Sequence, residues 1–244
     1  MPRFFFDASS LCGDTVTLTG ESASHILLSL RMAVGDSLEL CDGEGHDYPG
    51  TIVSASREAV TVSVSAPVPS CSEPPYAVRL YQCVPKGDKF ETVIQKSVEC
   101  GVTEIIPVQS SRCIAKIKRE DAQKKLTRYQ RIAEEAAKQS GRGRIPQVRE
   151  PVSFSEALTM MKRDDFSFLC YENEDGKTVA DRLRQGDMPK SVSFLIGPEG
   201  GLSPEEVEKA ASEGIVSVSL GNRILRTETA STFVLAILAA FYEL

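Results

Sequence analysis

The chain has no long hydrophobic run and no cysteine pair at metal-binding spacing. Its longest apolar stretch, residues 233–242, is about half of the roughly 20 residues that a membrane span requires. The N-terminus, MPRFFFDASS, has no apolar segment of signal-peptide length. The seven cysteines are scattered, odd in number and never spaced as C-x-x-C, which indicates neither a disulfide framework nor a zinc site. We therefore expect a cytoplasmic protein without a membrane anchor or a bound metal.

Several nucleotide-binding and catalytic signatures are also missing. Neither G-x-x-x-x-G-K-[ST] nor G-x-G-x-x-G occurs, which disfavours P-loop and Rossmann phosphate sites. The absence of G-x-S-x-G and H-E-x-x-H makes an unrelated hydrolase an unfavoured alternative. Histidine occurs only at positions 25 and 46, so no histidine is available in the C-terminal part of the chain.

Positive charge is concentrated in one segment of an otherwise acidic chain. Of the 244 residues, 41% are hydrophobic and 25% charged, as in a soluble globular protein with a sizeable core. Residues 112–149 contain twelve Lys or Arg and four acidic residues, a segment charge of +8. Since the whole chain carries −6, the remainder carries −14. A basic face on an acidic body is typical of phosphate binding, and a solvated helix face is the alternative explanation.

A proline-rich segment, residues 66–76, divides the chain. Four prolines in these eleven residues suppress both helix and sheet pairing. Before it, short strand-like runs separated by turn residues predict a small barrel or sandwich; they lie at 15–18, 37–40, 50–53 and 60–64. A short helix is predicted at residues 22–32. We expect domains at residues 1–70 and 71–244.

Beyond the proline-rich segment, strand-like and helix-like stretches alternate. Strands are predicted at 78–84, 103–109, 166–172, 192–197 and 216–220, and helices at 89–101, up to about 139, at 153–163, at 204–212 and up to 241. This alternation predicts an α/β fold with a parallel sheet covered on both faces. Ligand sites in such folds lie beyond the carboxyl ends of the strands.

A nearly side-chain-free loop, Gly197–Gly201, follows one predicted strand. Glycines permit positive φ and close approach of the backbone, so exposed amides at this strand end can hold a polar ligand. Ser203–Glu206 then supplies a helix start with an N-cap, a proline at N1 and a capping-box glutamate. A tight connection without function is the alternative.

Two further loops follow predicted strands. Residues 219–230 present Ile224 and Leu225, which are able to sandwich a purine, beside Arg226 at a helix start. Residues 170–175 are acidic, and a carboxylate there could receive ribose hydroxyls or an amine. We expect all three loops at the same end of the sheet.

GPEGG after an apolar strand, with SLGNRILRTETA about twenty residues later, resembles the SPOUT-class methyltransferases. The resemblance is greatest to the RsmE family, which methylates N3 of a uridine in small-subunit (16S) ribosomal RNA. It covers nearly the whole chain, because HILLSLRM, KGDKFE, the S-R-C turn at 111–113 and AAKQSGR occur in the family's order. It implies a SPOUT domain with a deep trefoil knot at residues 71–244 and a small PUA-like RNA-binding β-barrel at residues 1–70.

The resemblance implies that the three loops bind S-adenosylmethionine. Arg226 would stabilise charge that develops on a uracil carbonyl, and Glu228, a water molecule or solvent would accept the N3 proton. Glu172 is the candidate for a ribose or amino contact. The implied cofactor-binding residues are Tyr171, Glu172, Leu195, Ile196, Gly197, Pro198, Glu199, Gly200, Gly201, Ser219, Leu220, Gly221, Ile224, Leu225, Arg226, Thr229 and Ala230.

The target base must be splayed out of its stack, which requires grip on the flanking RNA. The candidate RNA-binding residues are Arg3, His25, Arg31, Lys86, Lys89, Arg112, Gln139, Ser140 and Arg142, with phosphate contacts that weaken as salt rises. The final helix is apolar on nearly every face, which predicts burial in a two-fold homodimer. The alternative function is that of a non-catalytic RNA-binding protein on the same scaffold.

Overall fold

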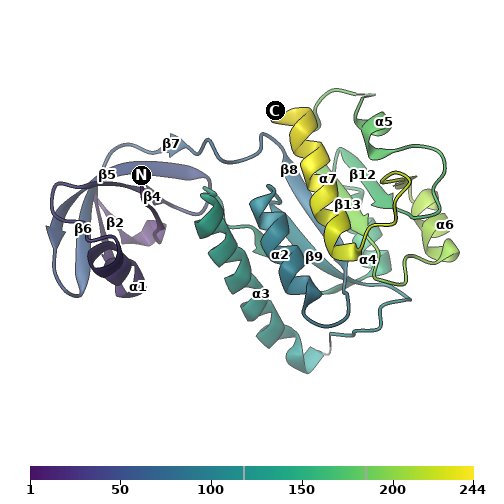
Figure 1. Cartoon of the computed structure of the whole chain (residues 1–244), viewed down its shortest axis with the longest axis horizontal. Coiled ribbons are helices and arrows are strands. Elements are labelled where there is room, and N and C mark those ends of the chain that lie inside the picture. The colour runs from purple at the N-terminus through teal and green to yellow at the C-terminus, as the bar shows by residue number, and fades with distance from the viewer. Residues whose placement is uncertain (118, 185) are drawn as a thin grey trace. The chain divides into compact units, whose positions relative to one another are not determined.

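The computed structural model describes residues 1–117, 119–184 and 186–244, which form two compact units (Figure 1). One unit joins Met1–Glu73 with Ala137–Ile145, and the other joins Pro74–Ala136 with Pro146–Leu244. The expected domain boundary after residue 70 stays a prediction. No helix among the described residues has both the length and the apolar character needed to cross a membrane.

The first unit is built on a seven-stranded sheet in the order β1-β4-β5-β6-β3-β2, with β7 paired to β5. Its strands are β1 (Arg3–Phe5), β2 (Leu11–Cys12), β3 (Thr15–Thr19), β4 (Ser37–Cys41), β5 (His46–Ala55), β6 (Ala59–Val64) and β7 (Val68–Pro69). The four predicted β-runs are confirmed as β3 to β6. Alternate residues of β3 and β6 are buried, which is the period of a strand with one face on a core.

The helix predicted at residues 22–32 is confirmed as far as residue 29, where it consists of two short elements. An α-helix, α1 (Gly20–Ser24), passes directly into a π-helical turn, η2 (His25–Ser29). Ile26 is buried there, and the ring of His25 meets Phe4 edge-on at 5.6 Å between centroids. The segment therefore covers one side of the core of this unit.

Residues from the middle of the chain complete the first unit. Arg142 is buried, and its Nη2 lies 2.7 Å from Oε2 of Glu73. Arg3 donates to the carbonyl oxygen of Gly141 at 2.6 Å and pairs with the buried carboxylate of Asp47. Because buried charges must be paired to be tolerated, these contacts hold the 137–145 segment in the unit.

The second unit contains a parallel sheet in the order β10-β9-β8-β13-β12-β14, with β11 paired to β9. Its strands are β8 (Ala77–Cys83), β9 (Glu104–Gln109), β10 (Gln147–Val148), β11 (Val152–Ser153), β12 (Phe166–Cys170), β13 (Ser191–Ile196) and β14 (Val216–Val218). Its helices are α2 (Lys89–Glu99), α3 (Arg119–Ser140), α4 (Phe154–Met161), α5 (Val179–Leu183), α6 (Pro204–Ser212) and α7 (Thr227–Tyr242). The C-terminal residues of α3 belong to the first unit.

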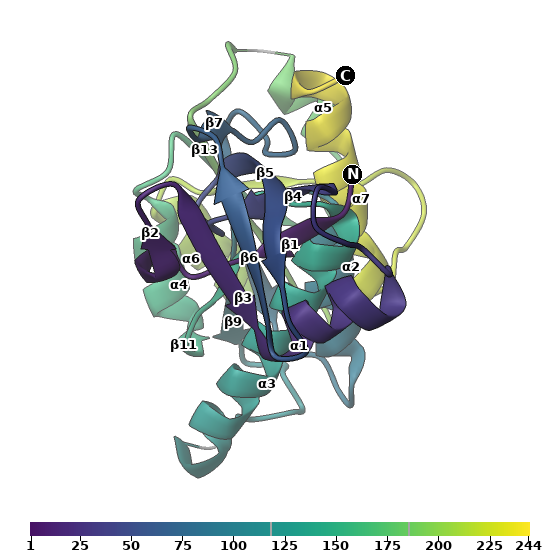
Figure 2. The ribbon, with the colours of Figure 1, turned by 90° about the vertical axis from the view of Figure 1, so that its left-hand side faces the viewer.

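Helices cover both faces of this sheet, as the α/β prediction requires. Helices α4 and α6 share a core with Tyr81, Leu169 and Leu195. Helices α2 and α7 pack against each other on the opposite face, as Figures 1 and 2 show. The predicted stop of α2 at Gly101 is confirmed by its φ of +93°, and the predicted capping box of α6 is confirmed at Ser203 and Glu206. The knot stays a prediction.

Candidate functional site

Three loops leave the second sheet at one edge because of how β12 is paired. This strand lies between β13 and β14 and is parallel to both. Its last residue, Cys170, is aligned with Ile196 on one side and with Val218 on the other. The loops that begin at residues 171, 197 and 219 therefore start side by side.

Backbone hydrogen bonds connect the first and third of these loops. The amide of Tyr171 donates to the carbonyl of Val218 at 3.1 Å, and the amide of Ser219 donates to Lys177 at 2.9 Å. In the middle loop, Gly201 N–H donates to Pro198 at 2.9 Å and closes a tight turn. The first and third loops are thus bonded to each other, and the middle loop is closed by a turn of its own.

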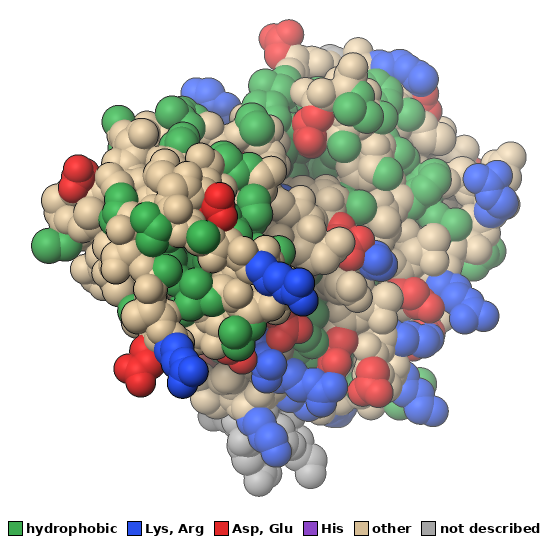
Figure 3. Space-filling model, turned by 60° about the vertical axis from the view of Figure 1, so that its left-hand side comes forward, with side chains coloured by type: hydrophobic (Ala, Val, Ile, Leu, Met, Phe, Trp, Pro, Cys, Tyr) green, Lys and Arg blue, Asp and Glu red, His purple; other side chains and the backbone are tan. Residues whose placement is uncertain are grey.

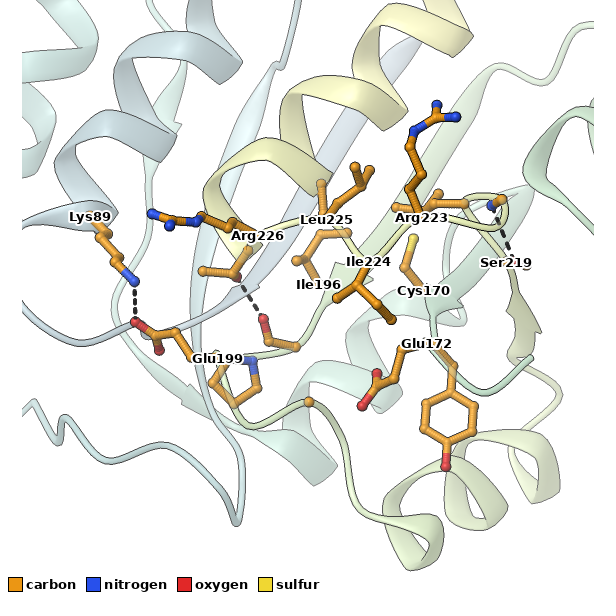
Figure 4. A pocket seen from close by; sticks show the side chains of 18 residues that line it. Lys89, Cys170, Glu172, Ile196, Glu199, Ser219, Arg223, Ile224, Leu225 and Arg226 are labelled. Carbon is orange, nitrogen blue, oxygen red and sulfur yellow. Dashed lines mark hydrogen bonds and ion pairs between the residues drawn. The ribbon is translucent and has the colours of Figure 1, made fainter. Parts of the chain in front are cut away.

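A cavity of about 390 Å³ lies between the loops and the start of α7 (Figure 4). This volume is within the range of small-molecule sites. Most of the lining is apolar or backbone, with Glu172 and Glu199 as its acids. It is lined by Lys89, Cys170, Tyr171, Glu172, Ile196, Gly197, Pro198, Glu199, Gly201, Ser219, Leu220, Gly221, Arg223, Ile224, Leu225, Arg226, Thr227 and Ala230.

The structure places most of the predicted cofactor residues around this cavity, with three outside the lining. Leu195 is fully buried in the core on the α4 side of the sheet, because neighbouring strand residues point to opposite faces. Gly200 and Thr229 are exposed and do not line the cavity. Lining residues that the predicted cofactor set lacks are Lys89, Cys170, Arg223 and Thr227. Cys170, Arg223 and Thr227 lie in the stretches 170–175 and 219–230, which could have indicated them, whereas Lys89 comes from another part of the chain.

Gly201 is required by both its backbone and its surroundings. Its φ is +67°, a conformation that a residue with a Cβ adopts at a cost. A Cβ at this position would lie 2.0 Å from Oε1 of Glu172. The carboxylate of Glu172 therefore lies directly against the backbone of the glycine loop, and a side chain at position 201 would push this carboxylate away.

The first glycine of the loop is also closely surrounded. A Cβ on Gly197 would lie 3.3 Å from the carbonyl carbon of Gly201 and 3.3 Å from Cγ of Leu202. The loop folds back on itself at this point, so a ligand in the cavity meets main chain on this side. Opposite lie the apolar side chains of Ile224 and Leu225. Burial raises the pKa of the Cys170 thiol, which keeps this part of the wall uncharged.

Glu199 joins the glycine loop to the start of α2. Its carboxylate accepts a hydrogen bond from Nζ of Lys89 at 2.9 Å and from the backbone amide of Lys86 at 3.1 Å. Partial burial opposes ionisation of Glu199, but these hydrogen bonds outweigh that effect and lower the pKa of its carboxyl. The Lys89 ammonium is thereby held at the end of the cavity where Arg226 also lies (Figure 4).

The two predicted catalytic residues stand at the start of α7. Arg226 is the N-cap residue and lines the cavity, and its side chain makes no capping hydrogen bond. Glu228 is in the first turn and does not line the cavity. Its Oε2 atom is buried and has no hydrogen-bond partner in the part of the chain that the structure describes.

The candidate RNA-binding residues divide into bound and exposed groups. Arg3 and Arg142 make the internal ion pairs of the first unit, and Nη1 of Arg112 donates to the carbonyl of Gly200 at 2.9 Å. His25, Arg31, Lys86 and Gln139 are exposed, and Lys89 and Ser140 are partly buried. His25 and Arg31 lie at opposite ends of the segment that contains the buried Ile26, and Arg31 has a φ of +55°.

The basic segment is partly neutralised by internal pairs. Arg128 pairs with Glu91 at 2.8 Å, Arg131 pairs with Glu135 at 2.9 Å, and Arg149 pairs with Glu104. Lys118 lies outside the described residues, as do the side chains of residues 119–121. Figure 3 shows acidic side chains interspersed with the Lys and Arg side chains at the lower edge of its face.

Comparison with known proteins defines the class. A family model described as RNA methyltransferase domain matches residues 72–239, and one described as RNA methyltransferase PUA domain matches residues 18–65. A ribosomal RNA small subunit methyltransferase E from Bacillus subtilis is 37% identical over 251 aligned residues, which cover 100% of this chain and 98% of the relative. One from Synechocystis is 33% identical, with 94% and 74% covered.

The fold gives the same result. A ribosomal RNA small subunit methyltransferase E from Neisseria gonorrhoeae, solved bound to S-adenosyl methionine, superposes with a TM-score of 0.85 and 33% identity. The superposition covers 99% of this chain and 98% of that one. Fold and family models together define an RNA methyltransferase of the SPOUT class with an N-terminal PUA-like domain. The chain belongs to the ribosomal RNA small subunit methyltransferase E (RsmE) family.

We predict that replacing Lys89 by Met raises the pKa of the Glu199 carboxyl toward its ordinary value, because the strongest hydrogen-bond donor is lost. A lowered folded-state pKa stabilises the fold at neutral pH, and this contribution is lost as pH falls through that pKa. Because the pair is partly exposed, it contributes at most about 1 kcal/mol. Carboxyl NMR titration measures the shift.

The control is Lys96→Met, which removes a lysine of the same helix whose partner is Glu99 at 2.9 Å. The titration of Glu199 should be unaffected by this change. An unaltered Glu199 titration in Lys89→Met would contradict the assignment of Lys89 as its partner.

Proposed function

We propose that the chain transfers the methyl group of S-adenosylmethionine to N3 of a uridine in 16S ribosomal RNA. The glycine-floored cavity at the ends of β12, β13 and β14 carries this proposal. It is supported by the name of the Bacillus subtilis relative and by the cofactor bound to the Neisseria gonorrhoeae structure. Both relatives match over essentially the full chain.

The residues of the cavity fit this cofactor. The Gly201 amide and the Gly197 carbonyl are hydrogen-bonded to Pro198 and Thr227, so the Gly197 amide and the Gly201 carbonyl are the main-chain groups that could meet polar edges of a ligand. Ile224 and Leu225 offer apolar surface to a purine. The carboxylate of Glu172 is placed to accept hydrogen bonds from ribose hydroxyls or to pair with an amino group. When bound, the cofactor supplies an electrophilic methyl group, and the protein supplies alignment and exclusion of water.

Arg226 is the residue that we assign to the reacting base. A uridine that loses its N3 proton carries negative charge on its carbonyl oxygens, and a guanidinium close to them stabilises that charge as it develops. Lys89 lies at the same end of the cavity, where its charge is balanced by Glu199. Glu228 stays a candidate for the proton acceptor, beside water and solvent.

The exposed basic residues would hold the flanking RNA. Arg31, Lys86 and Lys138 are exposed and offer phosphate contacts whose strength falls as salt rises. Arg3 and Arg142 would act indirectly, by holding the 137–145 segment in the N-terminal unit. We expect this chemistry in the cytoplasm, where small-subunit RNA is the partner.

The proposal is tested by incubating the protein with 16S RNA or small subunits lacking the modification and with labelled S-adenosylmethionine. Nucleoside mass spectrometry should reveal 3-methyluridine. RNA retention without measurable cofactor binding would instead support a non-catalytic RNA-binding protein on the same scaffold. Comparing bare RNA with assembled subunits identifies the preferred substrate.

Gly201→Ala should weaken S-adenosylmethionine binding by at least about tenfold, because it strains the φ of +67° and displaces the Glu172 carboxylate. Gly200→Ala is the matched control, since its Cβ would meet only Arg112 at an ordinary 3.6 Å. Calorimetry should show the control within about twofold of the unaltered protein. Equal affinities in the two variants would contradict the assigned floor.

Arg226→Ala should lower turnover by about a hundredfold or more while leaving cofactor affinity nearly unchanged, because its guanidinium acts on the transition state. Arg223→Ala is the control, since this side chain extends away from the Arg226 end of the cavity (Figure 4). Single-turnover methylation and calorimetry separate the two effects. Unchanged turnover in Arg226→Ala would refute the role.

We propose that α7 forms part of a homodimer interface. Its buried side includes Val234, Leu235 and Leu238, but an apolar stripe on another side is exposed or half-buried. The stripe has helical spacing and consists of Phe233, Ala236, Ile237, Ala240 and Phe241. A two-fold pair would cover it.

Ala240→Glu should shift the protein from dimer to monomer in sedimentation velocity, because it places a charge in the apolar stripe. Ala211→Glu, at an exposed position of α6, should leave the dimer intact. A protein that is monomeric before substitution, or a dimer unaffected by Ala240→Glu, would remove this proposal.

A further inference from the structure

A buried chain of hydrogen bonds connects three elements behind the cavity. Gln82, on β8, is fully buried, and its Nε2 donates to Oγ1 of Thr227 at 2.8 Å. Thr227, the first residue of α7, donates its hydroxyl to the carbonyl oxygen of Gly197 at 2.7 Å. The chain therefore links β8, the start of α7 and the glycine loop, and both Thr227 and Gly197 line the cavity.

The direction of each bond is fixed by the groups involved. A carbonyl oxygen only accepts, so the single hydroxyl proton of Thr227 is directed at Gly197, and its oxygen must accept from Gln82. Gln82 Nε2 also donates to the carbonyl of Cys83 at 3.0 Å. Both protons of the Gln82 amide are thus used in buried bonds.

The acceptor atom of the Gln82 amide, in contrast to its donor, has no hydrogen bond among the residues that the structure describes. This atom, Oε1, is also buried. A buried unsatisfied acceptor destabilises a fold, and an apolar side chain of similar length would avoid that penalty. Glutamine at this position therefore lowers the stability of the fold but supplies the Nε2 donor, which indicates that the donor has a role beyond packing.

We infer that Gln82 is a positioning residue for methyl transfer, acting through the hydroxyl of Thr227 on the carbonyl of Gly197. This inference rests on the proposed function. Arg226 directly precedes Thr227 and has no side-chain capping bond of its own, so its place is set by the first residue of α7. The hydrogen-bonded chain fixes that residue against the glycine loop, and hence fixes Arg226 relative to the cofactor floor.

The position of the linkage determines which kinetic quantity it controls. Arg226 acts on the base and the glycine loop holds the cofactor. Movement of Arg226 relative to the glycine loop would therefore misalign the two reactants. Small misplacements of aligned groups slow the chemical step strongly without preventing binding. Loss of the chain should therefore reduce kcat, with KM for RNA unchanged and cofactor affinity little altered.

The test uses the full-length protein in four variants. Gln82→Met and Thr227→Val remove the donor and the hydroxyl with little change in volume, and Thr227→Ser retains the hydroxyl. The fourth variant combines Gln82→Met with Thr227→Val. We measure kcat and KM for RNA, S-adenosylmethionine affinity by calorimetry, and melting temperature.

Each of the two disruptive single changes should lower kcat by about tenfold, and Thr227→Ser should recover most of the activity that Thr227→Val loses. The double variant should be no slower than the slower single variant, because both changes break one chain. Equal kcat in the Val and Ser variants, or additive losses in the double variant, would overturn the inference. A variant whose melting temperature falls but whose kcat, measured well below that temperature, is unchanged would also overturn the inference.

The outcome is separable from that of the proposed function. If the unaltered protein binds no S-adenosylmethionine or methylates no RNA, the proposed function is refuted before any variant is compared. If Gln82→Met does not fold, the two Thr227 variants are sufficient for the test, because Val has as many heavy atoms as Thr and Ser lacks only the methyl group.

Discussion

The parallel pairing of β12 with both β13 and β14 is the constraint on which the site depends. Parallel neighbours in register end at the same level, so the alignment of Cys170 with Ile196 and Val218 brings three loops to one edge. None of the three is a site by itself. One is rich in glycine, one is largely apolar with a terminal arginine, and one is acidic. Together they enclose a cavity with main chain, apolar surface and a carboxylate around it.

The conformation of the glycine loop is fixed by contacts with neighbouring residues, although glycine is the most flexible residue type. Glu172 approaches Gly201 so closely that a methyl group would displace it, and Gly197 is surrounded by residues of the same loop. Glu199 connects the loop to α2, and Thr227 connects it to α7. The part of the site with the fewest side chains is therefore held from three directions. This is the preorganisation that alignment of two reactants requires.

Much of this could be predicted from the sequence because it has local causes. Apolar periodicity, caps and glycine stops identified the strands and helices, and strand ends beside glycines identified the loops. The identity of Lys89 as a lining residue could not be found this way, because α2 contributes it from far away in the chain. Leu195 was misplaced for a related reason: a strand buried on both faces shows no alternation, so the residue that faces a cavity cannot be told from its neighbour.

Arginines illustrate a second limit. Arg3 and Arg142 have the same side chain as residues that bind phosphate, yet the structure uses them in internal ion pairs. Composition counts both kinds as positive charge. Arg3 and Arg142 differ from phosphate-binding arginines because each pairs with a carboxylate distant in sequence, Asp47 for Arg3 and Glu73 for Arg142. No sequence pattern predicts either pair. Short elements such as α5 and β1 were missed because they are too brief to show a period.

The pairing of Arg142 with Glu73 also bears on the order of synthesis. The N-terminal unit contains Met1–Glu73 but needs Ala137–Ile145 to bury its own charges. A ribosome that has released only the first 73 residues has therefore produced an incomplete unit, in which Glu73 lacks the guanidinium of Arg142 and the backbone amides of Gly143 and Arg144. The hydrophobic core of the unit lies within residues 4–62, so it can assemble early, whereas the Glu73 contacts form only after the intervening strands and helices have emerged.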